Sequence, residues 1–523
     1  MKITGYIFHG TAITGDWSKP VALTSVDEFK SKFGTYGPEG SQTFEYVSGV
    51  LSAGLPVLFQ RIACQDQANV SWSNGVPTVP SEVQRAQCAT FTVSHTVTES
   101  NVDTTVNDLT VSEKFGGTYG NAMSVNFSVK NKTHWIEIRY NNIVLEKYKI
   151  VTMTGDEDVY TKNMKFINAI NSIEFARVNV DIDIDITDET AVMGFVIPDF
   201  GEGVFNKLTG GTDFAEGLVA AEIPSLIYAD SSASVRPLIL DKILYQPKFI
   251  TSGGYTDEDG TNIGAAMKNL TEARQDCRAL IDLPLGLPKS NQQTKAAEYG
   301  YAQLSGATII PSASMCAPWC YMQVGSAQVW MPPSFVYLTV VGDALSKGGK
   351  VYTPKAGVSS GRVYNVLKPE FAIGSDIAEK WQSEGQTNIN PIMQLQSGDY
   401  IIAGNSTLLT IDTDEVNAFN ESSADLTVIE IRRFMYNLAE ELQYQYNSVT
   451  AFEDFSLKAS NFLNIMVSNG AVADYAIANI STEDDPRTLK LKVNVWVTPT
   501  IKAIEINLNI AYGSVTMSTG GEA

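Results

Sequence analysis

The chain has 523 residues, of which 44% are hydrophobic and 18% charged, so it can bury the cores of roughly two to four domains. A formal net charge of −21 excludes an ordinary nucleic-acid binder, which needs a basic face to neutralise phosphates. The sequence has neither an apolar run of about 18 residues nor the continuous apolar start of a signal peptide, so we expect no transmembrane helix, no stable membrane association and no export.

Residues 1–75 predict the first part of an α/β core. Residues 2–9 have the alternation of a strand, and Ser25 and Glu28 have the spacing of a capping box, in which each side chain satisfies the other's backbone N–H. Two short amphipathic helices are predicted after this box, followed by a strand over 56–63. The order strand, helix, helix, strand is typical of an α/β fold.

Residues 76–211 predict a mostly-β domain inserted into that core. Threonine, valine, serine and asparagine dominate and often alternate, and helical periodicity is confined to about 160–175. Helices and strands alternate again over 212–420, which predicts a central α/β domain with helices on the faces of a sheet. The strands are expected at 225–230, 279–284 and 307–312, and the helices near 262–280 and 291–304.

Residues 421–523 predict two helices and two closing strands. Thr427 and Glu430 have capping-box spacing at the head of the first helix, and the second helix, with Ile465 on its inner face, ends near Asn469. The apolar positions of the closing strands are Leu489, Leu491, Val493, Val495 and Val497 in the first and Ile504, Ile506, Leu508 and Ile510 in the second. A closing strand either pairs within its own sheet or completes the sheet of a neighbouring molecule.

Four charged residues lie off the apolar stripe of the first of these helices. They are Arg432, Arg433, Glu440 and Glu441. Two interpretations remain open for them: the charges belong to a solvated helix face, or they face a partner or a neighbouring copy of the chain.

The cysteines and histidines offer little for metal or redox chemistry. Five cysteines form an odd and scattered set, which favours reduced thiols over a disulfide framework. The spacing of Cys316 and Cys320 differs from that of a C-x-x-C pair, which favours buried thiols over a metal or redox site. The three histidines, His9, His95 and His134, are not paired at metal-ligand spacing. We therefore expect no cofactor and no bound metal.

Two short motifs imitate functional patterns without their context. Gly357 to Gly361 matches the nucleophile elbow G-x-S-x-G, but a Gly-Gly-Lys loop stands where the elbow needs a buried strand. The segment from Asp181 to Asp188 is similar to a calcium loop, but Ile186 occupies the position that requires glycine, so an alternating strand is favoured. No phosphate-binding loop of the form G-x-x-x-x-G-K-[ST] occurs. The residues therefore favour a protein that is not an enzyme.

Several further segments follow one another in a recognisable order. They are KPVALTSVDEFKSKFG (19–34) with PVLFQRI (56–62), FGGTYGNAMSVNFSV (115–129), LTGGTD (208–213), APWCYMQV with VWMPPS (317–334), IEIRRFMYNL (429–438) and WVTPTIKAIEINL (496–508). Taken together, these segments resemble the tail sheath family of contractile phages and related injection machines.

The resemblance implies a structural subunit without catalytic residues or cofactors. Such a subunit polymerises as stacked hexameric rings around a separate tail tube protein, and shortens from a metastable extended state to drive the tube through the host envelope. Baseplate and tail-terminator proteins are the further partners, and the site of action is the virion tail after assembly in the bacterial cytoplasm. The C-terminal region would face the tube, the inserted domain would lie outside, and strands would be exchanged between neighbouring copies.

One departure and two alternatives accompany this resemblance. Family members commonly begin with an extended arm, whereas this chain starts almost at its first predicted core strand, so the arm's exchange could fall to another edge. The first alternative is another virion component, such as a baseplate or tail-terminator protein. The second is a virion-surface protein that binds or hydrolyses glycans, since 58 acidic residues always offer candidate carboxylate pairs.

Overall fold

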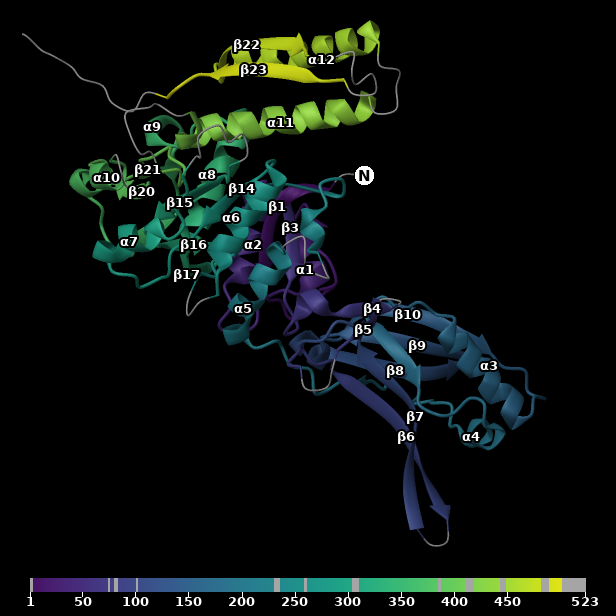
Figure 1. Cartoon of the computed structure of the whole chain (residues 1–523). Coiled ribbons are helices and arrows are strands. Elements are labelled where there is room, and N and C mark those ends of the chain that lie inside the picture. The colour runs from purple at the N-terminus through teal and green to yellow at the C-terminus, as the bar shows by residue number, and fades with distance from the viewer. Residues whose placement is uncertain are drawn as a thin grey trace, which may run out of the picture.

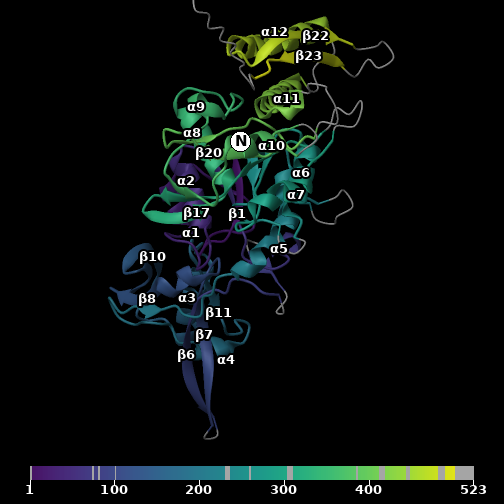
Figure 2. The ribbon, with the colours of Figure 1, turned by 90° about the vertical axis from the view of Figure 1, so that its left-hand side faces the viewer.

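The computed structural model describes residues 3–73, 76–79, 83–99, 102–229, 236–257, 261–302, 310–383, 387–410, 418–442, 448–480 and 489–500. The described chain forms a core around a large sheet, a β-rich part on one side of it and a helical C-terminal part on the other (Figure 1). A view turned by 90° shows the same order (Figure 2). The predicted α/β multidomain class is confirmed.

A nine-stranded sheet forms the core. Its order is β18 (Arg362–Val363), β21 (Tyr400–Ile402), β20 (Asn390–Gln394), β15 (Ala313–Ala317), β14 (Arg278–Ile281), β13 (Tyr245–Thr251), β1 (Ile3–Gly10), β3 (Val57–Arg61) and β2 (Val21–Leu23). From β20 to β3 all neighbours are parallel, and the remaining pairs towards the two edges are antiparallel. Both outermost strands are short, which leaves little open edge for unwanted pairing.

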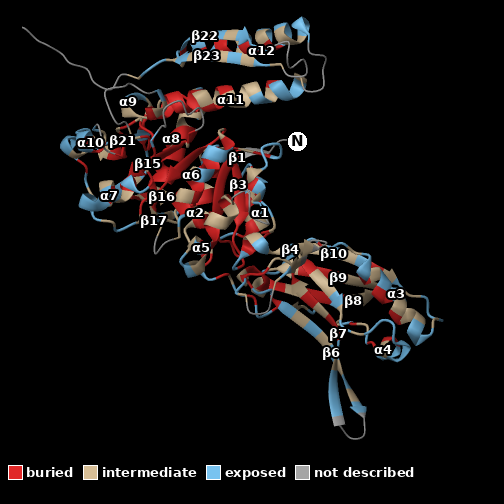
Figure 3. Ribbon diagram, viewed as in Figure 1, coloured by how far each residue is buried: buried red, intermediate tan, exposed pale blue. Residues whose placement is uncertain are grey.

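Helices cover both faces of this sheet, because its parallel strands are apolar on both sides (Figure 3). These helices are α1 (Val26–Phe33), α2 (Thr43–Ser52), α5 (Glu216–Ile227), α6 (Ile263–Arg274), α7 (Gln292–Ala297), α8 (Pro333–Ser346) and α10 (Ser375–Trp381). One apolar cluster joins Phe8 of β1 to α1, α2 and α8. The other joins Ile7 of β1 to α5, α6, α7 and α10.

Two smaller sheets flank the core. One has the order β17 (Ala327–Met331), β16 (Cys320–Val324) and β19 (Val366–Pro369). The other pairs β4 (Ser71–Ser73) with β5 (Val76–Thr78), and α9 (Gly357–Ser360) is a short helix before β18. The elbow motif therefore forms a helical turn that does not follow a buried strand, as its context predicts.

The β-rich part, here called the β module, comprises two sheets and two helices. Its elements are the sheet of β11 (Val178–Ile182), β7 (Val102–Glu113) and β6 (Thr90–Glu99), the sheet of β10 (Ile143–Thr152), β9 (Thr133–Tyr140), β8 (Met123–Lys130) and β12 (Asn206–Lys207), and the helices α3 (Val159–Asn171) and α4 (Glu189–Gly194). The inner faces of both sheets share one apolar cluster with α3, in which Val111, Phe127 and Phe166 are fully buried. The outer ends of β6 and β7 extend beyond the module as a ribbon (Figures 1 and 2).

Arg61, at the end of β3, joins the β module to the core. Its side chain is fully buried. The guanidinium donates to the carbonyl oxygens of Ala12 at 3.0 Å and Gly15 at 2.8 Å on the core side, and of Phe115 at 3.0 Å and Gly116 at 2.7 Å on the module side. Burial lowers the pKa of Arg61 to about 10, which still leaves the group charged at neutral pH. One cation thus ties two parts of the fold together.

The first predicted helix cap is confirmed with a small change. Ser25 Oγ accepts a hydrogen bond from the backbone N–H of Glu28 at 3.2 Å, and α1 ends at Gly34. The carboxylate of Glu28 accepts from the backbone N–H of Thr24 at 2.8 Å, one residue before the cap. A capping box in the strict sense would need the N–H of Ser25 itself.

Three other local predictions were wrong. Thr427 is no N-cap, because α11 (Ser422–Leu442) begins at Ser422 and the hydroxyl of Thr427 donates to the carbonyl of Ser423 at 2.9 Å. The apolar run from residue 225 continues α5, and the strand of this region is β13. Ile465 of α12 (Val449–Ser468) is 58% exposed. The strand predicted from Asp181 is confirmed as far as Ile182, with Asp181 exposed and Ile182 half-buried. Half of the strand predicted at 307–312 lies outside the described residues, and residues 310–312 directly precede β15.

Candidate assembly surface

The helix α11 crosses the core and carries the rest of the C-terminal part (Figure 1). Its first residues, 422–427, are all buried, whereas the far end of the helix is largely exposed (Figure 3). Behind it, α12 packs on α11 through the stacked rings of Phe434 and Phe462, whose centroids are 4.0 Å apart. The strands β22 (Val472–Asn479) and β23 (Leu491–Val497) form a hairpin on α12. The hairpin is therefore a sheet of its own, separate from the core sheet.

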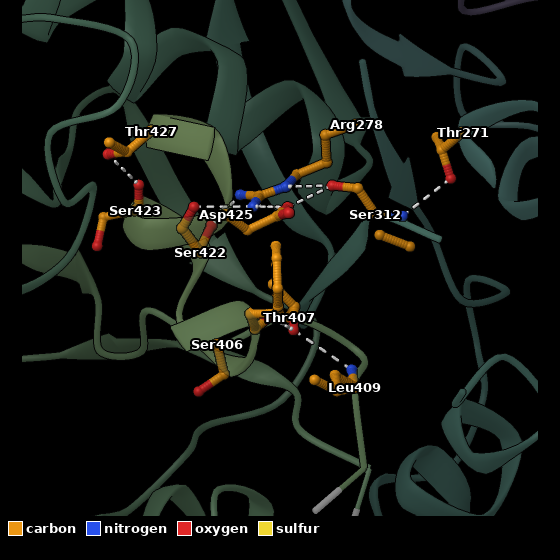
Figure 4. A network of polar contacts seen from close by, with 12 residues as sticks. Thr271, Arg278, Ser312, Ser406, Thr407, Leu409, Ser422, Ser423, Asp425 and Thr427 are labelled. Atoms are coloured by element: carbon orange, nitrogen blue, oxygen red, sulfur yellow. Dashed lines mark hydrogen bonds and ion pairs between the residues drawn. The ribbon is translucent and has the colours of Figure 1, made fainter. Parts of the chain in front are cut away.

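A buried ion pair fixes the start of α11 to the core sheet (Figure 4). The guanidinium of Arg278 on β14 pairs with the carboxylate of Asp425, and the exposed fractions of the two side chains are 0% and 5%. Arg278 also donates to the carbonyl of Ser422 at 2.8 Å and to Ser312 Oγ at 3.2 Å. The hydroxyl of Ser312 in turn donates to Asp425. Because every charge in this network has a partner, α11 is held in one position.

A second anchor lies halfway along the helix, at Arg433. Its guanidinium donates to the carbonyl oxygens of Gln246 and Pro247 on β13, both at 2.7 Å, and pairs with Glu430 at 3.4 Å. Glu430 also pairs with Lys248 at 3.2 Å. The side chain of Arg433 is only 9% exposed, and its hydrogen bonds and ion pair join α11 to β13 within the subunit.

The other predicted charges of α11 lie nearer the surface. Arg432 is half-buried and donates to Gln275 Oε1 at 2.7 Å. Glu440 and Glu441 are exposed, and Glu441 forms an ion pair with Lys458 of α12 at 3.1 Å. Glu440 borders a cleft of about 350 Å³ between α11 and the segment before β13. The structure thus places the two glutamates at the outer end of α11, and Arg433 lines the same cleft as Glu440.

No described strand covers the outer edges of the hairpin. Within the described residues, β22 pairs with β23 and neither strand pairs with a third. Each strand therefore presents a row of backbone N–H and C=O groups along one side. The core sheet closes with short edge strands, whereas the hairpin strands are eight and seven residues long. Strands of this length could form several main-chain hydrogen bonds with an added strand.

The two faces of the hairpin differ as the alternation predicts. Leu491, Val493, Val495 and Val497 are half-buried, and Val493 and Val495 pack toward α12 and the apolar core. The opposite face carries Trp496, which is 53% exposed. Leu489, also half-buried, precedes β23. The predicted second closing strand, with Ile504, Ile506, Leu508 and Ile510, lies outside the described residues.

The other candidate residues, the cysteines and possible metal ligands, do not form a catalytic or metal site among the described residues. Cys316 and Cys320 are buried free thiols, and burial raises the pKa of Cys320 to about 12, so it is not a reactive thiolate. Across the described ranges, no three histidine, cysteine, aspartate or glutamate side chains come together as a metal site would require. None of the described helices is long and apolar enough to cross a bilayer.

Sequence reasoning missed the buried arginines that organise the fold. Arg61, Arg274 and Arg278 are fully buried, and each lies within or next to an apolar strand or helix. A charged residue inside such a run is a usable signal, because a buried guanidinium needs several acceptors and so marks a junction. The acceptors of these arginines are mostly backbone carbonyls, which every residue has, so the sequence does not indicate which residues supply them.

Comparison with known proteins identifies the fold. No protein-family model matches the sequence, and no curated protein matches it significantly. The sheath tail protein of Listeria innocua matches in structure with a TM-score of 0.59 and 11% identity, covering 95% of this chain and 92% of that chain. The sheath tail protein of Desulfitobacterium hafniense matches with a TM-score of 0.56 and 11% identity, covering 95% and 94%. The chain therefore has the fold of these sheath tail proteins, as the resemblance of its segments predicts.

Proposed function

We propose that this chain, which shares the fold of sheath tail proteins over almost its whole length, is a structural subunit of a contractile tail sheath. It polymerises around a tail tube and shortens from a metastable extended state, which drives the tube through a host envelope. The similarity in fold supports this proposal but does not by itself assign a function. The open hairpin edges carry the functional argument.

The hairpin suits a protein that must remain linked to its neighbours while it moves. Main-chain hydrogen bonds to an added strand need no particular side chains, so several bonds form along one edge. The apolar face of β23, with Val493 and Val495, rests on α12 and keeps the edge extended. We propose that a neighbouring copy supplies the added strand, and that its residues include Ile504, Ile506, Leu508 and Ile510.

The anchors of α11 allow the hairpin to transmit force. Arg278 with Asp425, and Arg433 with two carbonyls of β13, hold the helix on the core sheet. A pull on the hairpin therefore moves the core as a rigid body, while the polar surfaces between copies slide and repack. The extended lattice is kinetically trapped, and contraction releases the free energy stored during assembly.

The proposal also assigns partners and domains. Copies of the chain form stacked hexameric rings, and residues 421–523 face the tube, with Arg432, Glu440 and Glu441 toward the tube or the next copy. The region 76–211 lies outside, on the core of residues 1–75 and 212–420. Baseplate and tail-terminator proteins bind the ends of the stack in a virion assembled in bacterial cytoplasm. The subunit acts without a cofactor and is not an enzyme.

Electron microscopy of the purified protein tests this function. Negative staining is expected to show rings or tubes of the full chain, and discrete small particles would contradict the proposal. A variant that ends at Thr500 keeps every described residue, so it is expected to fold with unchanged circular dichroism and to remain unassembled. A peptide of residues 501–512 is expected to bind this variant, and the same peptide with Ile506→Pro serves as the control, because proline removes a donor from the strand.

A further inference from the structure

The two sheets of the β module carry opposite charge. Residues 90–113 and 178–189, which include β6, β7 and β11, contain no lysine or arginine but several acidic residues. Residues 123–152, which form β8, β9 and β10, carry mainly basic ones, and β12 adds Lys207. The module as a whole therefore has an acidic sheet and a basic sheet.

The outer face of the acidic sheet, here called the acidic face, is exposed and lacks counter-charges. Asp181 lies opposite Thr110 in the ladder of β11 and β7, and both Asp181 and Asp183 are exposed. Partial burial and the nearby charge of Asp183 raise the pKa of Asp181. No lysine or arginine in the described ranges forms an ion pair with either residue. This repulsion would be relieved by a cation from outside the subunit.

The outer face of the other sheet, here called the basic face, carries Arg139, Lys147, Lys149 and Lys207. Arg139 and Lys147 share one carboxylate, that of Glu137, at 2.7 and 2.6 Å. Lys149 and Lys207 are exposed and form no ion pair with any described residue. The face therefore keeps a net positive charge although the chain as a whole is strongly negative.

The two charged faces point away from each other, because the inner faces of both sheets contribute to the same apolar cluster. They cannot neutralise each other within one molecule. When the molecule is repeated along a line or around a ring, the acidic face of one copy can meet the basic face of the next in a heterologous contact. Opposite charges at such a contact speed association and fix its orientation.

We propose that the β modules of neighbouring copies dock acidic face to basic face. The partner is a second copy of this chain, and Asp181 and Asp183 of one copy lie near Lys149 and Lys207 of the next. This inference rests on the proposed function, because only a polymer places many modules in repeated register. The contact is independent of strand addition at the hairpin and is screened by salt, since its charges are exposed.

Charge reversal with rescue tests the proposal. We would compare Lys149→Glu/Lys207→Glu, Asp181→Lys/Asp183→Lys and the variant with all four substitutions, measuring the critical concentration for assembly by light scattering. Each double variant places like charges in contact and is expected to raise this concentration about tenfold or more. The fourfold variant restores opposite charges and is expected to lie within about threefold of the wild type. Raising the salt concentration is expected to increase the critical concentration of the wild type and to reduce the difference in critical concentration between the wild type and the double variants.

The controls separate this proposal from the proposed function. Lys289→Glu/Lys380→Glu makes the same change in net charge on the core and is expected to leave assembly unchanged. Wild-type protein that stays monomeric at all concentrations would overturn the sheath function and this inference together. This inference alone would be overturned if the wild type assembles and the double variants have the same critical concentration. It would also be overturned if a folded fourfold variant assembles as poorly as the double variants.

Cross-linking keeps the proposal testable if the fourfold variant does not fold. In a Cys88→Ser background, which removes the exposed thiol, Lys149→Cys and Asp181→Cys are combined in one chain. A short bismaleimide is expected to produce a ladder of linked copies under assembly conditions, whereas either single cysteine alone gives at most dimers. A double-cysteine chain that gives no ladder would contradict the contact.

Discussion

Breaking the buried ion pair between Arg278 and Asp425 should loosen α11 from the core. Asp425→Ala leaves a fully buried guanidinium without its carboxylate partner, although Ser312 and Ser422 still accept hydrogen bonds from it. Removing one member of a buried pair costs about 3–5 kcal/mol, because the other charge remains unpaired in a low-dielectric environment. Replacing both members, as in Arg278→Met/Asp425→Leu, removes the stranded charge and should cost about 1 kcal/mol or less. The double variant is thus the matched control.

Hydrogen exchange of the α11 backbone amides, followed by mass spectrometry, measures this effect locally. Asp425→Ala should accelerate exchange in residues 422–442 by roughly a hundredfold to a thousandfold, since each factor of ten corresponds to about 1.4 kcal/mol of opening free energy. The β module, which shares no residue with the network, should exchange at an unchanged rate. Equal rates in the wild type and Asp425→Ala would refute the anchoring role, as would a double variant that loosens α11 as much as the single one.

Three further predictions concern the core and its junctions. Burial raises the pKa of Asp282 to about 7 from 3.8. The contribution of Asp282 to the free energy of unfolding is therefore present below about pH 4 and lost as the pH rises through 7. In urea titrations over this range, the wild type should lose up to ~4 kcal/mol of stability relative to Asp282→Asn. Arg61→Met leaves four carbonyls without their donor and should destabilise the junction by about 3 kcal/mol or more. Limited proteolysis should then cleave the chain faster between the core and the β module, and an unchanged cleavage rate would contradict this prediction. Gly49→Ala places a Cβ 2.5 Å from the ring of Phe335, so it should destabilise the fold by about 1–3 kcal/mol and lower the melting temperature. Gly217→Ala is the control, because its Cβ would have no neighbouring atom within 4 Å and should leave the melting temperature unchanged.

Sequence patterns predicted the elements whose residues determine them locally. Ser25 and Gly34 delimit α1, and the alternation of Leu491 to Val497 gave the strand and its two faces. The order of the predicted strands and helices indicated the α/β class, and residue types together with alternation indicated a β-rich insertion. The proposed limits of that insertion at 76 and 211 remain a prediction, because sequence composition changes gradually at both ends.

The errors arose where tertiary contacts override local signals. Thr427 has the spacing of a cap, but the network around Arg278 extends α11 back to Ser422 and buries the threonine. For Arg433, which lies off the apolar stripe, the sequence left a solvated face and a partner-facing charge open, and carbonyl oxygens of β13 lie beside it. A helix pattern cannot show that a second, polar contact covers its flank.

Imaging assembled particles by cryo-electron microscopy tests most directly whether copies share strands. The account predicts density for at least one additional strand beside β22 or β23, traceable to residues 504–510 of a neighbouring copy, in both the long and the short form of the tail. A map in which both hairpin edges stay unpaired, or in which residues 504–510 pair only within their own subunit, would contradict it.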